Sequence, residues 1–79
     1  LPKATLLKAE VYLEKGEPDQ TITLTTEAFE ADPLFGEALI LQGKAWLAKK
    51  RPDLAEKDFQ AAISIDSRLR QKVSQSQTP

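Results

Sequence analysis

The feature that most restricts the fold of this chain is its similarity to itself at a fixed offset of 34 positions, which we call the repeat spacing. Shifting the sequence by that offset brings identical residues together at apolar and at turn positions, such as Leu7 with Leu41 and Pro18 with Pro52. The other identical pairs are Ala4 with Ala38, Leu13 with Leu47, Lys15 with Lys49, Asp19 with Asp53, Ala28 with Ala62 and Asp32 with Asp66. A fixed period of this length is typical of repeat architectures, so we expect two copies of one structural unit.

Each unit is predicted to be a helix, a turn and a second helix. Over residues 3–15, apolar side chains recur at the spacing of one helical face, and they are Leu6, Leu7, Val11, Tyr12 and Leu13. We expect Gly16 to end this helix, because glycine readily adopts the left-handed conformation. Pro18 suits the first turn of the next helix, where its missing amide hydrogen is not needed. The predicted helices are therefore 3–15 and 18–31 in the first copy, and 35–49 and 52–65 in the second.

The threonine-rich segment 21–26 conflicts with this scheme, because its β-branched residues alternate as in a strand. Its match at the repeat spacing to Leu54–Ile65, which has better helix formers, overrules that local preference. Each threonine still costs a helix about 0.5 kcal/mol relative to alanine. We therefore expect 18–31 to be the least stable helix.

A short fifth helix is predicted over residues 68–76, with Leu69 and Val73 four positions apart on one face. It would cap the last helix pair, although two apolar residues make a weak cap. The polar residues Ser74–Pro79 also suit an unstructured tail, to which we assign 77–79. We expect one domain over 1–76, with its first unit at about 2–35 and its second at about 36–67.

The composition argues against catalysis. The chain has no cysteine and no histidine, which removes thiol nucleophiles, thiolate metal sites and the commonest general base. Acidic pairs such as Glu10 with Glu14 are typical of a solvated helix face, and the three glycines are too isolated to form a phosphate-binding loop. We expect no enzyme activity, no catalytic or metal-binding residue and no cofactor.

The charge is small overall but unevenly distributed. A net charge of −1 gives no general attraction to nucleic acid or anionic lipid, and no apolar run approaches the roughly 18 residues that cross a bilayer. We therefore expect no nucleic-acid partner and no membrane insertion. Residues 1–34 carry a charge of −4 and residues 35–79 carry +3. This division suits either two solvated faces of different sign or head-to-tail stacking with a copy or with neighbouring repeats.

The start of the chain is informative as well. It begins with Leu1 and contains no methionine, so we expect it to be a part of a larger protein. A lack of cysteine does not assign a cellular compartment.

The pattern resembles the tetratricopeptide repeat family over about residues 2–67. In that family a small residue lies midway along the first helix and an aromatic residue lies one turn later; here these are Gly43 and Trp46, with Ala9 and Tyr12 in the first copy. The second-helix matches are Ala55, Phe59, Ala62, Ile65 and Asp66 in the second copy, and Ala28, Asp32 and Pro33 in the first. The departures are Thr21 and Thr25 in place of alanine and an aromatic, Lys8 and Gln42 in place of leucine, and Ser67 in place of proline.

The resemblance implies stacked hairpins whose first helices line a concave groove. The residues expected to face it are Leu6, Glu10, Leu13, Ile40, Lys44 and Leu47, with Glu14, Glu37 and Leu41 nearby. One branch of the family holds a partner's C-terminal carboxylates with basic and amide side chains. The corresponding positions here are Leu6, Glu10, Leu41, Gln71 and Gln75, so that clamp is absent. What remains is a largely aliphatic groove with one acid and one base.

We therefore expect a protein-protein interaction module that binds an amphipathic helix or an extended apolar segment of a partner protein or peptide in this groove. The same side chains equally suit packing against neighbouring repeats. The alternative is thus a structural spacer or a self-association unit, which forms a homo-oligomer or part of a longer array. Repeat arrays usually need about three units to be stable, so a neighbouring repeat or a partner copy is expected.

Overall fold

The structure, a computed structural model, describes residues 2–77 and is helical almost throughout. Its elements are α1 (Pro2–Glu14), α2 (Pro18–Ala31), α3 (Gly36–Ala48), α4 (Pro52–Ile65), a 3-10 turn (Ser67–Leu69) and α5 (Arg70–Gln77). Since no strand occurs in this range, the predicted all-α fold is confirmed. The last helix, α5, continues to Gln77, which is the first residue of the predicted tail. Residues 78–79, the rest of that tail, lie outside the described residues, as does Leu1.

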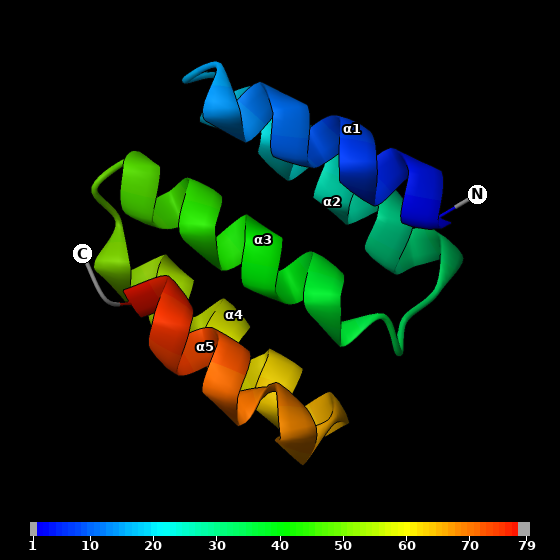
Figure 1. Cartoon of the computed structure of the whole chain (residues 1–79), viewed down its shortest axis with the longest axis vertical. Coiled ribbons are helices and arrows are strands. Elements are labelled where there is room, and N and C mark those ends of the chain that lie inside the picture. Colours follow the sequence, from blue (N-terminus) through cyan, green and yellow to red (C-terminus); the bar gives the residue numbers. More distant parts are fainter. Residues whose placement is uncertain (1, 78–79) are drawn as a thin grey trace.

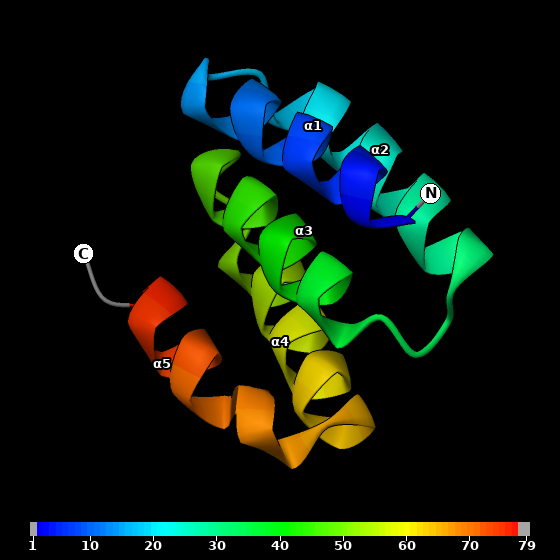
Figure 2. The ribbon, with the colours of Figure 1, turned by 45° about the vertical axis from the view of Figure 1, so that its right-hand side comes forward.

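The four long helices form two stacked antiparallel hairpins, α1 with α2 and α3 with α4. Figures 1 and 2 show α1, α3 and α5 lying side by side, with α2 and α4 behind them. The hairpins meet mainly where α2 packs on α3, and α5 packs on both α3 and α4. None of the helices within residues 2–77 has the length and apolar character that crossing a membrane requires.

The turns inside the two hairpins have the same geometry. Gly16 ends the first turn with φ of +79°, as expected of a glycine after a helix C-terminus. Lys50 holds the corresponding place in the second turn with φ of +62°, which the sequence analysis did not anticipate. In each turn the next amide donates to a carbonyl five residues back at 2.9 Å, from Glu17 to Tyr12 and from Arg51 to Trp46. These bonds satisfy carbonyl groups that a helix end leaves without partners.

The threonine run forms part of α2 because every hydroxyl in it finds an acceptor. The hydroxyl of Thr21 donates across the hairpin to the carbonyl of Ala9 at 3.1 Å, and that of Thr25 donates to the carbonyl of Ile22 at 3.1 Å. Both side chains are fully buried. The hydroxyls of Thr23 and Thr26 each donate to the carbonyl four residues back, at 3.1 and 2.8 Å respectively. Burial and hydrogen bonding thus override the strand preference of these residues.

Close packing of α3 against α4 depends on Gly43. A Cβ atom added there would lie 2.5 Å from the buried ring of Phe59, a separation that real side chains do not reach. The corresponding residues of the first hairpin are Ala9 and Thr25, both fully buried. Compared with the second hairpin, the first therefore has a larger residue on its first helix, alanine instead of glycine. It has a smaller residue on its second helix, threonine instead of phenylalanine.

Two apolar clusters form the core, one in each half of the molecule. The first joins α1, α2 and the start of α3, and its buried members are Leu6, Ala9, Ala28, Ala38 and Leu41. The second joins α3, α4 and α5, and its buried members are Leu39, Ile40, Ala55, Phe59, Ala62, Leu69 and Val73. The two residues predicted to make the fifth helix a cap, Leu69 and Val73, are thus both in the core.

Two members of the apolar face predicted for the first helix lie elsewhere. Leu7 and Val11 are 57% and 49% exposed, whereas Leu6, beside Leu7 in sequence, is buried. Residues four positions apart share one side of a helix, so this pair forms a second apolar strip on α1.

Candidate functional site

A groove of about 390 Å³ runs along the face made by the first helices of the hairpins and by α5. Three helices line it: Leu6 and Glu10 from α1, Glu37, Ile40, Leu41 and Lys44 from α3, and Lys72, Gln75 and Ser76 from α5. Four of the six predicted groove residues are therefore brought together here, and they are Leu6, Glu10, Ile40 and Lys44.

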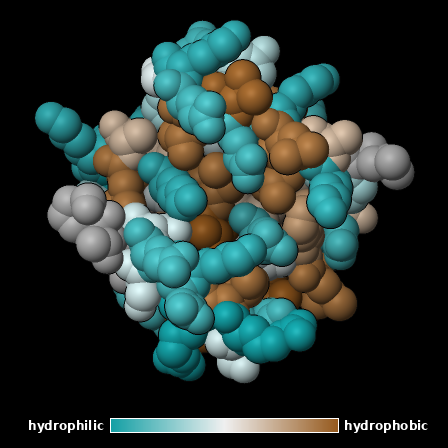
Figure 3. Space-filling view, viewed as in Figure 1, coloured by the Kyte–Doolittle hydropathy of each residue, from teal (hydrophilic) through white to brown (hydrophobic). Residues whose placement is uncertain are grey.

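The surface of the groove is more polar than predicted. Its aliphatic residues form the floor and are nearly covered: Leu6 is 8% exposed, Ile40 is 5% and Leu41 is 6%. Leu13 and Leu47, which were expected in the groove, do not line it and instead pack partly buried against the two core clusters. In Figure 3, which views this face, hydrophobic side chains appear between hydrophilic ones. A ligand would therefore meet charged walls before it reached the apolar floor.

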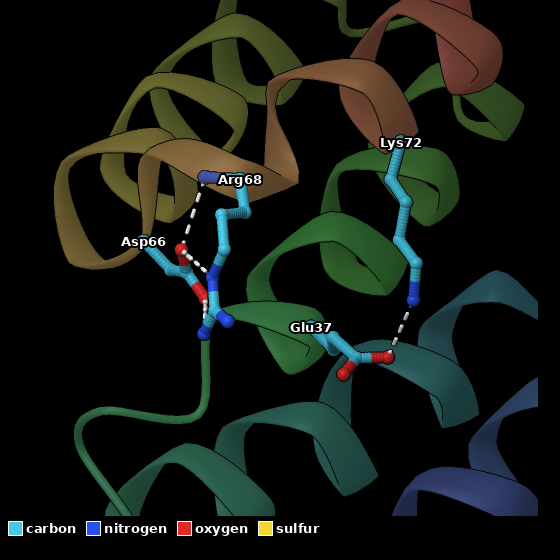
Figure 4. A network of polar contacts seen from close by, with 4 residues as sticks. All are labelled: Glu37, Asp66, Arg68 and Lys72. Atoms are coloured by element: carbon cyan, nitrogen blue, oxygen red, sulfur yellow. Dashed lines mark hydrogen bonds and ion pairs between the residues drawn. The ribbon is translucent and has the colours of Figure 1, made fainter.

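One wall is closed by an ion pair between α3 and α5. Lys72 Nζ lies 3.0 Å from Glu37 Oε2, with both side chains about half exposed (Figure 4). A pair with this exposure contributes about 0–1 kcal/mol to stability. It neutralises two of the four charges in the groove and ties α5 to its edge.

The entry to α5 is held by a carboxylate at the end of α4. Asp66 accepts a hydrogen bond from the amide of Arg68 at 3.0 Å, and two more from its guanidinium at 3.0 and 2.9 Å (Figure 4). The side-chain hydrogen bond from Arg68 is the main cause that lowers the pKa of Asp66 below its usual value. Asp32, at the corresponding place in the first repeat, accepts the same kind of bond from the amide of Leu34 at 3.1 Å.

The other two charges in the groove are available to a ligand. Glu10 and Lys44 are exposed, and neither forms an ion pair within the part of the chain that the structure describes. They are separated by the repeat spacing, on α1 and α3, and so occupy corresponding places on neighbouring helices. The groove thus offers an acid on one helix and a base on the next.

The contribution of α5 was mostly missed by the sequence analysis. Lys72 and Ser76 line the groove and had not been predicted there, and Gln75 had been considered only as a position of the absent carboxylate clamp. Gln71, the other such position on this helix, is exposed but does not line the groove. A signal was present in the sequence, because Phe35 and Leu39 correspond at the repeat spacing to the apolar residues Leu69 and Val73. In the structure α3 starts at Gly36 and α5 starts at Arg70, which is one repeat spacing later.

No protein-family model, curated protein or solved structure matches this chain. The geometry of the groove and the internal pattern of the chain are therefore the basis on which we assign a function.

Proposed function

We propose that this chain is a protein-binding module of the tetratricopeptide type, which holds an extended segment of a partner protein in the groove between α1, α3 and α5. The observation that carries the proposal is the groove itself. It combines an apolar floor with an acid and a base, Glu10 and Lys44, that form no ion pair among residues 2–77. Concave sites in which placed polar groups fix the orientation of a ligand are typical of ligand recognition.

The tetratricopeptide assignment is supported by the arrangement of the elements. The first helices span Pro2–Glu14 and Gly36–Ala48, so that their starts and their ends are both separated by the repeat spacing. The second helices, Pro18–Ala31 and Pro52–Ile65, are offset by the same distance. The small residue at Gly43 faces the aromatic ring of the second helix, which is the contact that the family pattern requires. These features favour two repeats followed by a shortened first helix of a third.

The charges in the groove define the chemistry of the partner segment. It should place a basic side chain opposite Glu10 and an acidic side chain opposite Lys44. Neighbouring helices lie about 8–10 Å apart, and an extended chain advances about 3.3 Å per residue. The base and the acid should therefore be about three positions apart. Because the floor is recessed, the residues between them should be small and aliphatic.

The expected preference can be measured with nine-residue peptides that carry one lysine and one glutamate, at every spacing and in both orders, among alanine and valine residues. The wild-type chain should bind best when the charges are three positions apart in one order. The variant Glu10→Lys with Lys44→Glu should prefer the opposite order, because it exchanges the two charges. Exposed ion pairs contribute up to about 1 kcal/mol each, so calorimetry should show a preference of about tenfold.

A matched control exchanges an acid and a base outside the groove. Glu27 on α2 and Lys57 on α4 are exposed and do not line the groove, so Glu27→Lys with Lys57→Glu should leave the peptide preference unchanged. Circular dichroism should show the same helix content in all three proteins. The proposal is wrong if no peptide binds saturably, or if exchanging Glu10 and Lys44 leaves the order preference as it was.

A further inference from the structure

The outer side of the first hairpin presents a second hollow, of about 330 Å³, on the α1 and α2 surface. We call it the outer face, and the residues that line it include Lys8, Val11, Tyr12, Lys15 and Leu24. The half-exposed Val11 belongs to the same apolar strip as Leu7. The groove has a different lining with no residue in common, so the outer face is a separate surface.

The same strip on α3 is covered by α2. On α1 the strip of Leu7 and Val11 continues to a third exposed residue, Ala4. The residues one repeat spacing later are all buried, and they are Ala38, Leu41 and Ala45. Ala38 and Leu41 pack in one core cluster with Ala28 of α2 and with Leu6 and Ala9 of α1, and α2 makes most of the contact between the first hairpin and α3. On α3 this strip is therefore a seat for a helix, and on α1 the corresponding seat is empty within the described chain.

The charges around the two seats correspond as well. On α3, Lys49 lies 5.9 Å from the ring centroid of Trp46 and forms an ion pair with Asp19 in the first turn of α2. On α1, Lys15 lies 5.9 Å from the ring centroid of Tyr12. Lys15 forms no ion pair with any residue that the structure describes. The cation and the aromatic ring are thus in place at the outer face, and the acid is missing.

We infer that the outer face binds an amphipathic helix of another protein, seated on α1 as α2 is seated on α3, with an acidic residue in its first turn opposite Lys15. An acid at that place is favoured by two interactions, one with Lys15 and one with the positive N-terminal end of its own helix. Lys8 takes the place of Gln42, whose Oε1 lies 3.4 Å from the hydroxyl of Thr25. Thr25 follows Asp19 by six residues, so a second acid six positions after the first is favoured opposite Lys8.

The probe for this inference is a capped peptide with the sequence of residues 17–33, because α2 already packs on a seat of this kind. It carries Thr25→Glu, to face Lys8, and alanine at the solvent-facing positions Thr23 and Thr26, to raise its helix propensity. Fluorescence anisotropy of the labelled peptide should show saturable binding below about 1 mM, and Leu7→Lys in the protein should weaken it at least about tenfold, because one strongly disfavoured contact of about 1.4 kcal/mol suffices.

A charge exchange then identifies the pair. Lys15→Glu in the protein should weaken binding about fivefold, and so should Asp19→Lys in the peptide. Combining the two should restore most of the affinity, since opposite charges then face each other again. Non-additive behaviour of this kind is the signature of a direct contact.

Three outcomes would overturn the inference. One is the absence of saturable binding. Another is a loss of binding on Lys49→Glu rather than on Lys15→Glu, which would mean that the peptide replaces α2 in the fold. The third is a dimer of the chain alone, seen by light scattering and removed by Leu7→Lys, because the occupant would then be a second copy. Failure of the groove peptides would leave this result unaffected, since their binding is tested by variants at Glu10 and Lys44.

Discussion

Gly16 and Lys50 occupy the same place in the two hairpin turns, with φ of +79° and +62°, yet only one of them is glycine. A side chain in the left-handed region brings Cβ too close to the following carbonyl and costs about 1–2 kcal/mol. The exposed Lys50 forms no ion pair within residues 2–77 that would offset this cost. The second turn is therefore strained in a way that the first is not.

This strain gives a prediction for one substitution. Lys50→Gly should raise the free energy of unfolding by about 1 kcal/mol, because glycine adopts the required φ without a Cβ clash. Urea denaturation followed by circular dichroism measures the change. Gly16→Lys is the converse variant and should destabilise the chain by a similar amount. A lower stability for Lys50→Gly would show that the lysine side chain makes a compensating contact.

Asp58, on α4, is a second residue whose environment opposes its usual state. Its Oδ2 atom is buried and has no hydrogen-bond partner within the described residues. Burial raises the pKa of this carboxyl, and a hydrogen bond with the side chain of Trp46 opposes the shift only in part. A carboxyl whose pKa is higher in the folded state binds more protons there, so its contribution to stability falls as the pH rises through the interval between the two values.

Asp58→Asn should remove this penalty while keeping an oxygen for the Trp46 indole. We expect the variant to be more stable than the wild type at pH 7, by roughly a few tenths of a kcal/mol because the group is only half-buried. The difference should vanish at pH values below the pKa of the unfolded carboxyl, where the wild-type residue is protonated in both states. Urea denaturation between pH 3 and pH 7 tests this, with the single tryptophan as fluorescent probe. An equal difference at every pH would contradict it.

At the scale of whole helices, the two hairpins solve the same packing problem with exchanged volumes. In the second hairpin, Gly43 leaves room for the ring of Phe59. In the first hairpin the corresponding residues are Ala9 on α1 and Thr25 on α2, whose side chain is smaller than that of phenylalanine. Interiors are packed closely enough that a change of one methylene is felt. Thr25 in α2 is therefore suited to Ala9, although the family pattern has a larger aromatic residue at that position.

The exchange predicts a rescue between two helices. Thr25→Phe alone should destabilise the chain by about 1–3 kcal/mol, because the ring has no room beside the Cβ of Ala9. Adding Ala9→Gly should recover at least about 1 kcal/mol of that loss, even though glycine by itself costs a helix about that much. A double-mutant cycle from urea denaturation gives the coupling energy. Strictly additive effects would mean that the two positions do not share one space.

For the molecule as a whole, the two ends are treated differently. The end formed by α4 is covered by α5, through the buried residues Leu69 and Val73 and the ion pair from Lys72 to Glu37. At the other end, Leu7 and Val11 remain about half exposed. The exposed end is therefore the one at which a further helix could bury apolar surface.

The uneven charge of the two halves is partly used within the molecule. Asp19 belongs to the acidic residues 1–34 and pairs with Lys49, from the basic residues 35–79. This pair joins α2 to the end of α3, where the hairpins meet. The other three ion pairs of the described chain lie within its second half. The opposite charges of the two halves thus form one ion pair, between Asp19 and Lys49, that joins the two hairpins.

The family resemblance implied Glu10 and Lys44 as groove residues, and both line it, but the lining from α5 was mostly missed. Lys72 reaches the groove through a fold-back of the chain at Asp66 and Arg68, where the family pattern has a proline instead of Ser67. Of the leucines expected in the groove, Leu6 lines it, whereas two others lie elsewhere. Leu13 and Leu47 pack on the core instead, because the helices rotate these positions toward their partners.

The ends of the four long helices were determined by the sequence alone, because they depend on local chemistry. The predicted 18–31 and 52–65 agree with α2 and α4, and the first helices differ by only a residue at each end. Gly16, Pro18 and Pro52 act through their own backbone preferences and need no distant neighbour. The tertiary structure decided which side of each helix is covered. Leu7 and Leu41 are the same residue at corresponding places of the sequence. Packing of the first hairpin against α3 buries Leu41, whereas Leu7 has no such neighbour among residues 2–77 and is exposed.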